Sequence, residues 1–455
     1  MTPPSLHSLW QATVRRRGGD RAIQPGDGGP GITFRDLATR AEHWATLHLG
    51  GAGDALRSTA VVFSAPQGPG WFEIFLGLIS RQAVVVCLDP AEPIAAQRQL
   101  AADLRAGFLW NGAGLEALPS PRRFRDSSIR LIKLTSGSTG RPRPLAFSDG
   151  QMTADGRQVT GTMGITSRDL NYALIPLGHS YGLGNLSIPL IVQGIPLVIG
   201  SAPLPHAIAA DFARWRPSVF PGVPALWRAL AASEVKLPGL RLAISAGAPL
   251  DPAIAALILQ RLGQPLHSFY GSSETGGITY DRTGQGGLEG HVGTAMKGVH
   301  LTAQPGQRLC VSSAAVLTLG NRRRREGRGA WLMADRVDLA STGQVRLLGR
   351  RGTTVKLAGR RLDLGEVSAR LRRLAGVSDV WVGVSDDREP VLGAAVASER
   401  DRAALRAELA ADTPTWKVPK KWMVVPALPV TERGKVDAAQ IRQRLFGPPA
   451  PAVQS

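Results

Sequence analysis

Segments of strand length and segments of helix length alternate along the first part of this chain. Residues 59–65 (TAVVFSA) predict a buried strand, residues 69–80 (PGWFEIFLGLIS) predict a helix, and residues 82–90 (QAVVVCLDP) predict a second buried strand. A strand, a helix and a strand in this order are typical of a βαβ unit. The chain is therefore predicted to have an α/β fold, with parallel sheets flanked by helices.

The same alternation continues toward the C-terminus and then changes. Further strands are predicted at 170–177, 195–200, 218–223, 240–247 and 264–271, with a helix at 183–192. From about residue 288, short alternating strands and Gly turns predict a β-rich subdomain, and after Gly349 the pattern predicts a compact α+β unit. We expect an N-terminal domain over 1–350, a small mobile C-terminal domain over 351–447 and a disordered tail over 448–455.

The net charge of +19 over 455 residues is unusual for a chain whose 43% hydrophobic content is that of a soluble globular protein. A nucleic acid or an anionic membrane is one possible partner for such a charge. Against this, Arg is spread along the chain, and the dense run at residues 322–325 lies in a Gly-rich stretch typical of an exposed loop. A basic protein would also favour an anionic nucleotide as substrate.

Two cysteines and the absence of long apolar runs bear on the compartment. Cys87 and Cys310 are far apart and form no C-x-x-C pattern, so neither a disulfide framework nor a zinc site is indicated. The N-terminus lacks the apolar core of a signal peptide, and no apolar run reaches the roughly 18 residues that span a bilayer. We expect a cytoplasmic protein without a membrane span.

The stretch LTSGSTGRPRPL at residues 134–145 is too rich in Gly and hydroxyl side chains for a regular helix or a packed strand. It could be a polar surface loop. It could also be a phosphate cradle, in which Gly lets successive N–H groups turn inward and hydroxyls add donors. It is not a Walker A loop, because no Gly-Lys-Ser/Thr follows at the required spacing.

Several motifs occur together in a fixed order. They are TSGSTGRPRPL, PLGHSYGL, SAGAPL, FYGSSETGG, MADRVDL, GRRGTTVKLAGRRLDLGEV and LPVTERGKVD. With this set the sequence resembles the adenylate-forming superfamily, which contains acyl- and aryl-CoA synthetases, peptide-synthetase adenylation domains and luciferases. The resemblance extends from residue 32 to about residue 445.

The resemblance implies a two-step reaction. A carboxylate attacks the α-phosphorus of ATP to give an acyl adenylate and pyrophosphate, and a thiol then forms a thioester. The implied cofactors are ATP, Mg²⁺, and CoA or a phosphopantetheine carrier protein as thiol acceptor. No carrier-protein motif follows residue 445, so we expect a free-standing enzyme.

The resemblance assigns the Gly-rich loop to the β- and γ-phosphates of ATP. The superfamily usually has Lys where this chain has Arg143, so the charge is kept while a planar fork replaces a point charge. The residues implied in phosphate binding are Thr135, Ser136, Gly137, Ser138, Thr139, Gly140 and Arg143.

The FYGSSETGG motif is implied to bind the rest of the nucleotide. Tyr270 would lie against the adenine, and Gly271 and Ser272 would line the same site. Ser273, where the superfamily commonly has Thr, would bond the α-phosphate. Glu274 would hold Mg²⁺, a hard ion that prefers carboxylate and phosphate oxygens; outside this motif it would be interpreted as a surface carboxylate.

Asp335 matches the aspartate that bonds both ribose hydroxyls, and Arg350 matches the arginine that assists it. The usual Tyr-x-Thr-Gly-Asp context is LMADR here. Asp338 is the nearby competitor, and the spacing to the GR pair at 349–350 favours Asp335.

Two residues are implied in the chemistry of the acid. Lys435 in TERGKVD matches the lysine that bridges the substrate carboxylate and the α-phosphate, where an ammonium stabilises developing charge. His179 matches a position that borders the acyl carboxylate, although a satisfied core histidine is the alternative. No Asp stands where peptide-synthetase domains pair with an α-amine, so the acid is expected to lack one. Candidate pocket residues are Tyr181, Gly182, Gly247, Ala248, Gly276 and Gly277.

Two glycines are implied in the second step. Gly359 matches the glycine that lets the C-terminal domain approach the active site where a pantetheine arm passes. The hinge position of the superfamily, often Asp or Lys, is Gly352 here.

Three functions remain open from the sequence. The first is an acyl- or aryl-CoA synthetase, and the second is an acyl-AMP ligase that loads a separate acyl carrier protein. The third is a non-catalytic or nucleic-acid-binding homologue, favoured by the charge and by Arg143 but opposed by Glu274 and Lys435. The identity of the acid and the oligomeric state are not given by the sequence.

Overall fold

The described residues of the computed structural model are 4–135, 143–317, 329–350, 354–357, 360–385, 387, 390–431 and 436–447. They divide into two compact units. The first unit comprises Met1–Thr302, Cys310–Leu332 and Leu339–Val345. The second comprises Ala303–Leu309, Met333–Asp338 and Arg346–Ser455.

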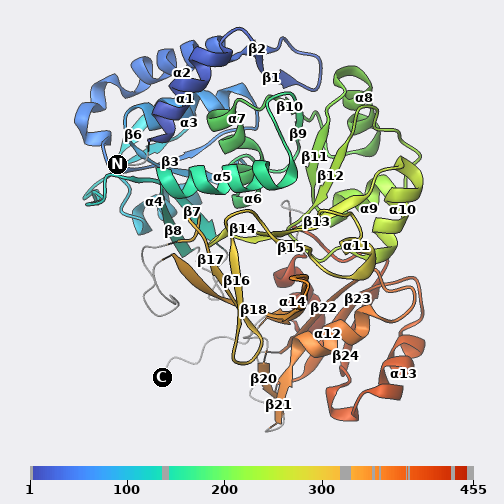
Figure 1. Cartoon of the computed structure of the whole chain (residues 1–455). Coiled ribbons are helices and arrows are strands. Elements are labelled where there is room, and N and C mark those ends of the chain that lie inside the picture. Colours follow the sequence, from blue (N-terminus) through green and yellow to red (C-terminus); the bar gives the residue numbers. More distant parts are fainter. Residues whose placement is uncertain are drawn as a thin grey trace. The chain divides into compact units, whose positions relative to one another are not determined.

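A six-stranded sheet lies in the early part of the first unit (Figure 1). Its strands are β3 (Ala60–Ser64), β4 (Val84–Leu88), β5 (Phe108–Trp110), β6 (Leu115–Ala117), β7 (Ile129–Thr135) and β8 (Arg143–Ser148). Their order is β6-β5-β3-β4-β7-β8, with parallel pairing from β5 to β7 and antiparallel strands at both edges. The Val-rich central strands are buried because helices must cover both faces of a parallel sheet.

A nine-stranded sheet forms the rest of that unit. Its strands are β1 (Arg21–Pro25), β2 (Ile32–Thr33), β9 (Asn171–Ala173), β10 (Leu197–Ile199), β11 (Val219–Gly222), β12 (Leu242–Ser245), β13 (Leu266–Ser272), β14 (Gly276–Tyr280) and β15 (Thr294–Ala295). The order is β15-β14-β13-β12-β11-β9-β10-β1-β2, with a parallel run from β13 to β1. The strands β14 and β15 continue the sheet as antiparallel neighbours of β13.

Helices connect these strands, and four of them begin at a proline, whose fixed φ suits the first helical position. The helices of the first unit are α1 (Leu6–Arg17), α2 (Phe34–Leu49), η1 (Gly50–Leu56), α3 (Pro69–Ser80), α4 (Ile94–Asp103), α5 (Asp149–Met163), α6 (Ser180–Gly182), η2 (Leu183–Ser187), α7 (Ile188–Gln193), α8 (Pro205–Trp215), α9 (Pro224–Ala231), α10 (Pro252–Leu262) and α11 (Gly286–Glu289). No helix among the described residues is long and apolar enough to cross a membrane.

Helix α5 contacts both sheets. It touches β7 and β8 of the six-stranded sheet and β14 of the nine-stranded sheet. Its start is fixed by a capping box, in which the Ser148 side chain accepts from the Gln151 N–H and the Gln151 side chain accepts from the Ser148 N–H. Its end is a left-handed residue, Gly164, with a φ of 65°. Helix α5 therefore has fixed ends and packs against both sheets.

The chain from residue 300 onward forms smaller sheets. A four-stranded sheet has the order β16-β17-β18-β19, β20 pairs with β21, and β22, β23 and β24 form a three-stranded sheet. These strands are β16 (His300–Gln304), β17 (Arg308–Ser312), β18 (Ala330–Leu339), β19 (Val345–Arg350), β20 (Thr354–Leu357), β21 (Arg360–Asp363), β22 (Asp379–Val384), β23 (Leu392–Ala397) and β24 (Lys421–Val425). The helices of the second unit are α12 (Leu364–Arg372), α13 (Arg402–Asp412), η4 (Thr415–Lys417) and α14 (Ala438–Phe446). Apolar residues of α12, β22, β23 and α13 form its core.

The predicted α/β class is confirmed, with helix α3 found over the predicted residues. The helix predicted at 183–192 is confirmed, and it consists of the π-helical turn η2 followed without a break by the α-helix α7. Pro189 has no N–H to donate to the Asn185 carbonyl, which accepts instead from Asn171 Nδ2 at 3.1 Å. The functional domain limits at 350 and 351 remain a prediction, and the tail over 448–455 lies outside the described residues.

Candidate active site

The β13–β14 hairpin carries the FYGSSETGG residues and needs glycine at its turn. Gly276 has a φ of +71°, a conformation that other residues rarely adopt. A Cβ on Gly271 would lie 2.8 Å from the Gly276 carbonyl oxygen, and a Cβ on Gly277 would lie 2.6 Å from Met296 Sδ. The register also shifts between Tyr270 and Gly271. The motif glycines are therefore required by the close packing of this hairpin.

The polar residues of the turn are held by short-range and long-range bonds. Ser272 Oγ and Thr275 Oγ1 are 3.0 Å apart, and the Leu317 N–H donates to the Glu274 carbonyl at 2.8 Å. Ser273 Oγ accepts from Ser180 Oγ at 2.9 Å. The last bond joins the SSE motif to the HSYG motif across 93 residues of sequence.

The HSYG segment begins with His179, which occupies the N-cap position of α6. The His179 N–H donates to the Pro176 carbonyl at 3.1 Å, and the His179 carbonyl accepts from the Leu183 N–H at 2.7 Å. A Cβ on Gly182 would overlap the Pro176 carbonyl, so glycine is needed to pass this turn. The main chain of His179 is thus fixed beside Ser180, which bonds Ser273.

Tyr181 brings an aromatic ring toward the same hairpin. Its ring centroid lies 5.7 Å from that of Phe269, and its hydroxyl donates to the Gly222 carbonyl at 3.3 Å. Burial raises the pKa of Tyr181 well above its ordinary value, so the side chain is a neutral phenol. Tyr181 therefore supplies an apolar face and not a charge.

Gly247 and Ala248 follow β12, on the strand next to β13. Gly247 has a φ of +90°, and the nearest atom to a Cβ placed there is Val223 Cγ1 at 3.7 Å. This position is free of side-chain crowding among the described residues. The candidate pocket residues of the sequence thus fall on neighbouring strands and on the α6 segment of one unit.

The phosphate loop is described at its two ends. Thr135 ends β7 and Arg143 begins β8, and Thr135 Oγ1 donates to the Arg143 carbonyl at 3.4 Å. The Arg143 guanidinium lies 5.9 Å from the Trp331 ring centroid, a cation–π arrangement that lysine would fit less well. The predicted residues Ser136, Gly137, Ser138, Thr139 and Gly140 lie outside the described residues.

The other residues predicted to bind the nucleotide, Asp335 and Arg350, belong to the second unit. Asp335 is 7% exposed on β18, and Arg350 ends the neighbouring strand β19. The Val337 N–H bonds the Gln307 carbonyl at 2.8 Å and so fixes the strand that carries Asp335. Gly352, Gly359 and Lys435 lie outside the described residues, so their roles stay predictions.

The sequence analysis missed a buried charged pair under the hairpin. Lys133 Nζ lies 3.8 Å from Asp155 Oδ2, and their side chains are 2% and 4% exposed. The signal was present, because Lys133 interrupts the otherwise apolar end of β7. Its partner on α5 could not be inferred, because contacts of a helix with a distant strand leave no local pattern.

The oxygen atoms near the hairpin fit a magnesium nucleotide. Among the residues that the structure describes, no group of three or more His, Cys, Asp or Glu side chains could hold a metal ion. Mg²⁺ needs no such cage, because it is usually held by one or two carboxylates and by the phosphates of a substrate. Glu274, on a turn with the hydroxyls of Ser272 and Ser273, supplies a donor set of that chemistry.

Comparison with known proteins agrees with this arrangement. Residues 112–304 match the model of the AMP-binding enzyme family. A feruloyl-CoA synthase from Amycolatopsis sp is 25% identical, with 92% of this chain and 95% of the relative aligned. An anthranilate–CoA ligase from Pseudomonas aeruginosa is 24% identical, with 84% of this chain and 86% of the relative aligned.

Solved structures share the fold. An anthranilate CoA ligase, AuaEII, in complex with anthranoyl-AMP aligns over 97% of this chain and 98% of its own, with a TM-score of 0.79 and 18% identity. ATP-bound MatB from Rhodopseudomonas palustris aligns over 97% of this chain and 99% of its own, with a TM-score of 0.78 and 19% identity. Residues 112–304 therefore match the AMP-binding enzyme family, and nearly the whole chain has the fold of these solved structures.

Proposed function

We propose that this protein is an AMP-forming acid–thiol ligase that activates a carboxylic acid with ATP and transfers the acyl group to CoA. The observation that carries the proposal is the bond between Ser180 and Ser273 at 2.9 Å, which joins the acid-binding motif to the nucleotide-binding motif. The aligned relatives named as CoA ligases support the same reaction.

The residues have distinct roles in the first step. Tyr270 and Asp335 hold the adenine and the ribose, and Ser273 bonds the α-phosphate. Glu274 holds the Mg²⁺ that neutralises the phosphates during in-line displacement. Lys435 stabilises the charge that develops on the α-phosphate oxygens while the acid carboxylate attacks. The acyl adenylate and pyrophosphate are the products of this step.

We propose an aryl acid as the substrate. The Tyr181 and Phe269 rings offer an aromatic surface, and the position of Gly247 leaves room beside β12. The sequence has no Asp to pair with an α-amine, so an α-amino acid is not expected. Feruloyl-CoA synthase and anthranilate–CoA ligase are names of aryl-acid relatives and support this choice.

The thiol acceptor is proposed to be CoA, with an acyl carrier protein as the second candidate. The peptide synthetase CmlP of Streptomyces venezuelae, 26% identical over 423 residues, gives some support for a carrier. The charge of +19 suits either acceptor, because both CoA and carrier proteins are acidic. A cytoplasmic location is proposed, in keeping with the use of ATP and CoA.

The experiment is a pyrophosphate-release screen over aromatic, short and long acids with Mg²⁺ and ATP. Acids that react are then tested for thioester formation with CoA and with a pantetheinylated carrier protein. We expect release with aryl acids and a thioester with CoA. A screen without pyrophosphate release from any acid contradicts the proposal.

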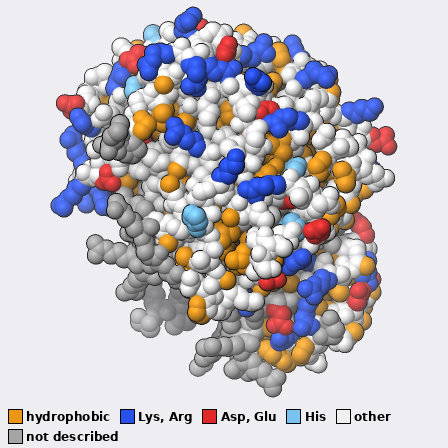
Figure 2. Space-filling view, in the orientation of Figure 1, with side chains coloured by type: hydrophobic (Ala, Val, Ile, Leu, Met, Phe, Trp, Pro, Cys, Tyr) orange, Lys and Arg blue, Asp and Glu red, His pale blue; other side chains and the backbone are white. Residues whose placement is uncertain are grey.

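The pyrophosphate-release screen also tests the alternative that this protein is a non-catalytic or nucleic-acid-binding homologue. On the face seen in Figure 2, Lys and Arg side chains are scattered and not gathered into one stripe, as a nucleic-acid groove would require. A salt-dependent DNA shift without ATP turnover would favour that alternative.

A further inference from the structure

Two buried ion pairs join strand β7 to helix α5. Arg130 Nε lies 3.3 Å from Asp149 Oδ2, with side chains 6% and 7% exposed. Lys133 Nζ lies 3.8 Å from Asp155 Oδ2, with side chains 2% and 4% exposed. Both pairs therefore connect the same strand to the same helix, at different positions along each.

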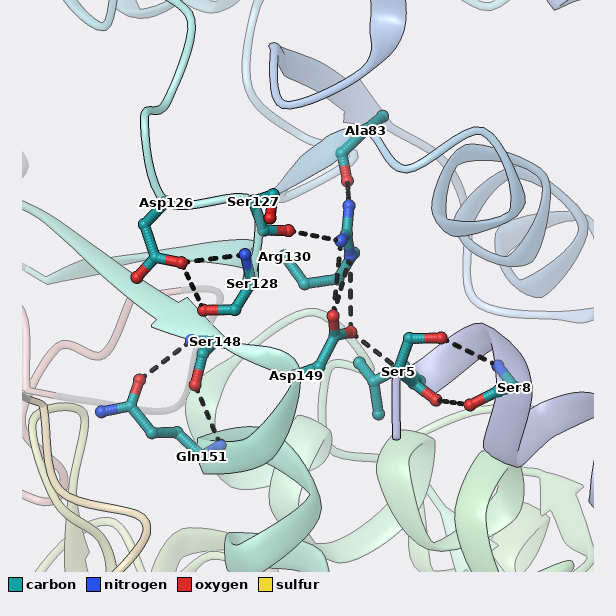
Figure 3. A network of polar contacts seen from close by, with 11 residues as sticks. Ser5, Ser8, Ala83, Asp126, Ser127, Ser128, Arg130, Ser148, Asp149 and Gln151 are labelled. Atoms are coloured by element: carbon teal, nitrogen blue, oxygen red, sulfur yellow. Dashed lines mark hydrogen bonds and ion pairs between the residues drawn. The ribbon is translucent and has the colours of Figure 1, made fainter. Parts of the chain in front are cut away.

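The first pair is part of a network away from the hairpin (Figure 3). Arg130 donates to the Ala83 and Ser127 carbonyls at 3.0 and 3.1 Å, and Asp149 accepts from the Leu6 N–H at 3.0 Å. These partners are main-chain groups just before β4, just before β7 and at the start of α1. The Arg130–Asp149 pair thus satisfies local main-chain groups of the scaffold.

The second pair reaches the nucleotide motif. Asp155 Oδ1 accepts from the Gly277 N–H at 3.0 Å, directly after the turn that bears Glu274. A Cβ on Gly276 would overlap the same oxygen, and a Cβ on Gly184 would lie 2.9 Å from Asp155 Oδ2. The Asp155 carboxylate is therefore packed against both the hairpin and η2.

Lys133 lies two residues before Thr135, where the phosphate loop begins. Its ammonium is 4.4 Å from the Phe147 ring centroid and faces Asp155. Burial lowers the pKa of Lys133, while the negative charges of Asp155 and Glu274 raise it. The nearest charged partner of the Lys133 ammonium is thus the Asp155 carboxylate, at 3.8 Å.

A gain in folding stability does not by itself explain why a buried ion pair such as Lys133–Asp155 is present. Removing two charges from water costs about as much as their attraction returns, and apolar replacements of buried pairs are often neutral or stabilising. The Gly277 bond gives the pair a different role. Residues that orient a metal ligand commonly hold it through hydrogen bonds of this kind.

We propose that Lys133 and Asp155 are positioning residues that fix the Gly276–Gly277 turn and thereby aim Glu274 at the magnesium nucleotide. This inference rests on the proposed function, because that function assigns Mg²⁺ to Glu274. Neither residue touches the reacting atoms. Their effect passes through the hydrogen bond from the Gly277 N–H to the Asp155 carboxylate, which Lys133 pairs and orients.

The test compares two double variants of the full chain. Lys133→Met with Asp155→Asn removes both charges, so the Gly277 N–H loses its charged acceptor and the ammonium that orients it, and keeps only a neutral amide oxygen. Arg130→Met with Asp149→Asn does the same to the matched pair and keeps an acceptor for the Leu6 N–H. The readouts are thermal unfolding, pyrophosphate release, and the binding of a fluorescent ATP analogue as Mg²⁺ is titrated from zero.

We expect the Lys133/Asp155 variant to need about 10- to 100-fold more Mg²⁺ for half-saturation of analogue binding. The Arg130/Asp149 variant is expected to keep the wild-type Mg²⁺ dependence, whatever its melting temperature. Should the first double variant give no cooperative melt, Lys133→Gln with Asp155→Asn carries the same expectation, because it removes both charges and keeps a polar pair of similar shape without leaving a buried charge unpaired. An unchanged Mg²⁺ requirement, or an equal shift in the matched pair, overturns the inference.

The binding readout separates this inference from the proposed function. A wild-type protein that binds the analogue in a Mg²⁺-dependent way, yet releases pyrophosphate with no acid, contradicts acid activation alone. The variants would then still test the positioning role. Pyrophosphate release with a normal Mg²⁺ requirement in the Lys133/Asp155 variant contradicts the positioning role alone.

Discussion

Ser180 illustrates how one side chain can connect two motifs that the sequence shows separately. Its hydroxyl donates to Ser273 Oγ at 2.9 Å, so the lone pairs and the proton of Ser273 have a fixed direction. A serine oriented in this way can offer its own proton to a phosphate oxygen. We therefore expect Ser180 to orient the Ser273 hydroxyl, a role that the sequence analysis did not give it.

We predict that Ser180→Ala lowers the rate of acyl-adenylate formation about three- to tenfold, as expected for a neutral hydrogen bond of about 1 kcal/mol. Single-turnover pyrophosphate release measures this step. Ser187→Ala is the control, because the Ser187 hydroxyl lies in the same helical stretch, is fully buried, and donates to the Leu177 carbonyl at 3.0 Å. A loss of the same size in both variants would assign the effect to general packing.

Lys435 allows a prediction that separates the two half-reactions. Lys435→Ala should abolish acyl-adenylate formation, because the missing ammonium is worth about 3 kcal/mol or more in the transition state. Thioester formation from a supplied acyl adenylate should continue largely unchanged. Lys420→Ala, at an exposed lysine of the same unit, is the control. If both half-reactions fall together, the role given to Lys435 is wrong.

At the level of elements, the link between the end of α5 and β9 depends on one carboxylate. Asp169 accepts from Arg241 Nη2 at 2.6 Å, from the Thr166 N–H at 2.9 Å and from Ser218 Oγ at 2.8 Å. Burial raises the pKa of Asp169, but these hydrogen bonds outweigh burial and hold the pKa below its ordinary value of 3.8. The ionised carboxylate therefore stabilises the first unit.

The sign of the pH dependence follows from this lowered pKa. Asp169 binds a proton more readily in the unfolded chain than in the folded one, because its pKa is lower in the folded state. The contribution of Asp169 to the free energy of unfolding is therefore fully present above pH 3.8, and it is lost as the pH falls through the folded-state pKa. Asp169→Asn should flatten the fall in the urea midpoint between about pH 5 and pH 2. Asp54→Asn, at an exposed position, should leave that slope as in the wild type. Equal slopes in wild type and Asp169→Asn would refute the assignment.

The elements also show what a sequence can and cannot reveal. Helix α3 was predicted from end to end, because its apolar run is bounded by Gly68–Pro69 at one side and by a turn at the other. The FYGSSETGG segment was predicted as part of a nucleotide site because its motif resembles that of the adenylate-forming superfamily. The π-turn at η2 was missed, because it depends on Asn171, far along the chain, satisfying the carbonyl that Pro189 leaves free. The buried pair of Lys133 and Asp155 was also missed, because the two residues lie on different elements, β7 and α5.

On the scale of the whole molecule, the proposed reaction needs residues from both units, since Glu274 belongs to the first and Asp335 to the second. The proposed second step adds the requirement that the C-terminal part change its position between half-reactions. Gly359 is the residue on which that step is predicted to depend.

We predict that Gly359→Trp slows thioester formation more than acyl-adenylate formation, because a large side chain would obstruct the path of a pantetheine arm. Pyrophosphate release and thioester formation, measured separately on one preparation, give the two rates. Gly51→Trp is a control in η1 of the first unit, where a Cβ would meet no atom within 4 Å and the backbone is not left-handed. Equal slowing of both steps in Gly359→Trp would count against alternation between two arrangements.

The second unit is assembled from Ala303–Leu309, Met333–Asp338 and Arg346–Ser455. The ribosome therefore synthesises the segments Ala303–Leu309 and Met333–Asp338 before the larger part of this unit, Arg346–Ser455. A chimera that exchanges this unit for that of a relative therefore needs several junctions. A single junction near residue 350 would keep Asp335 with the first unit.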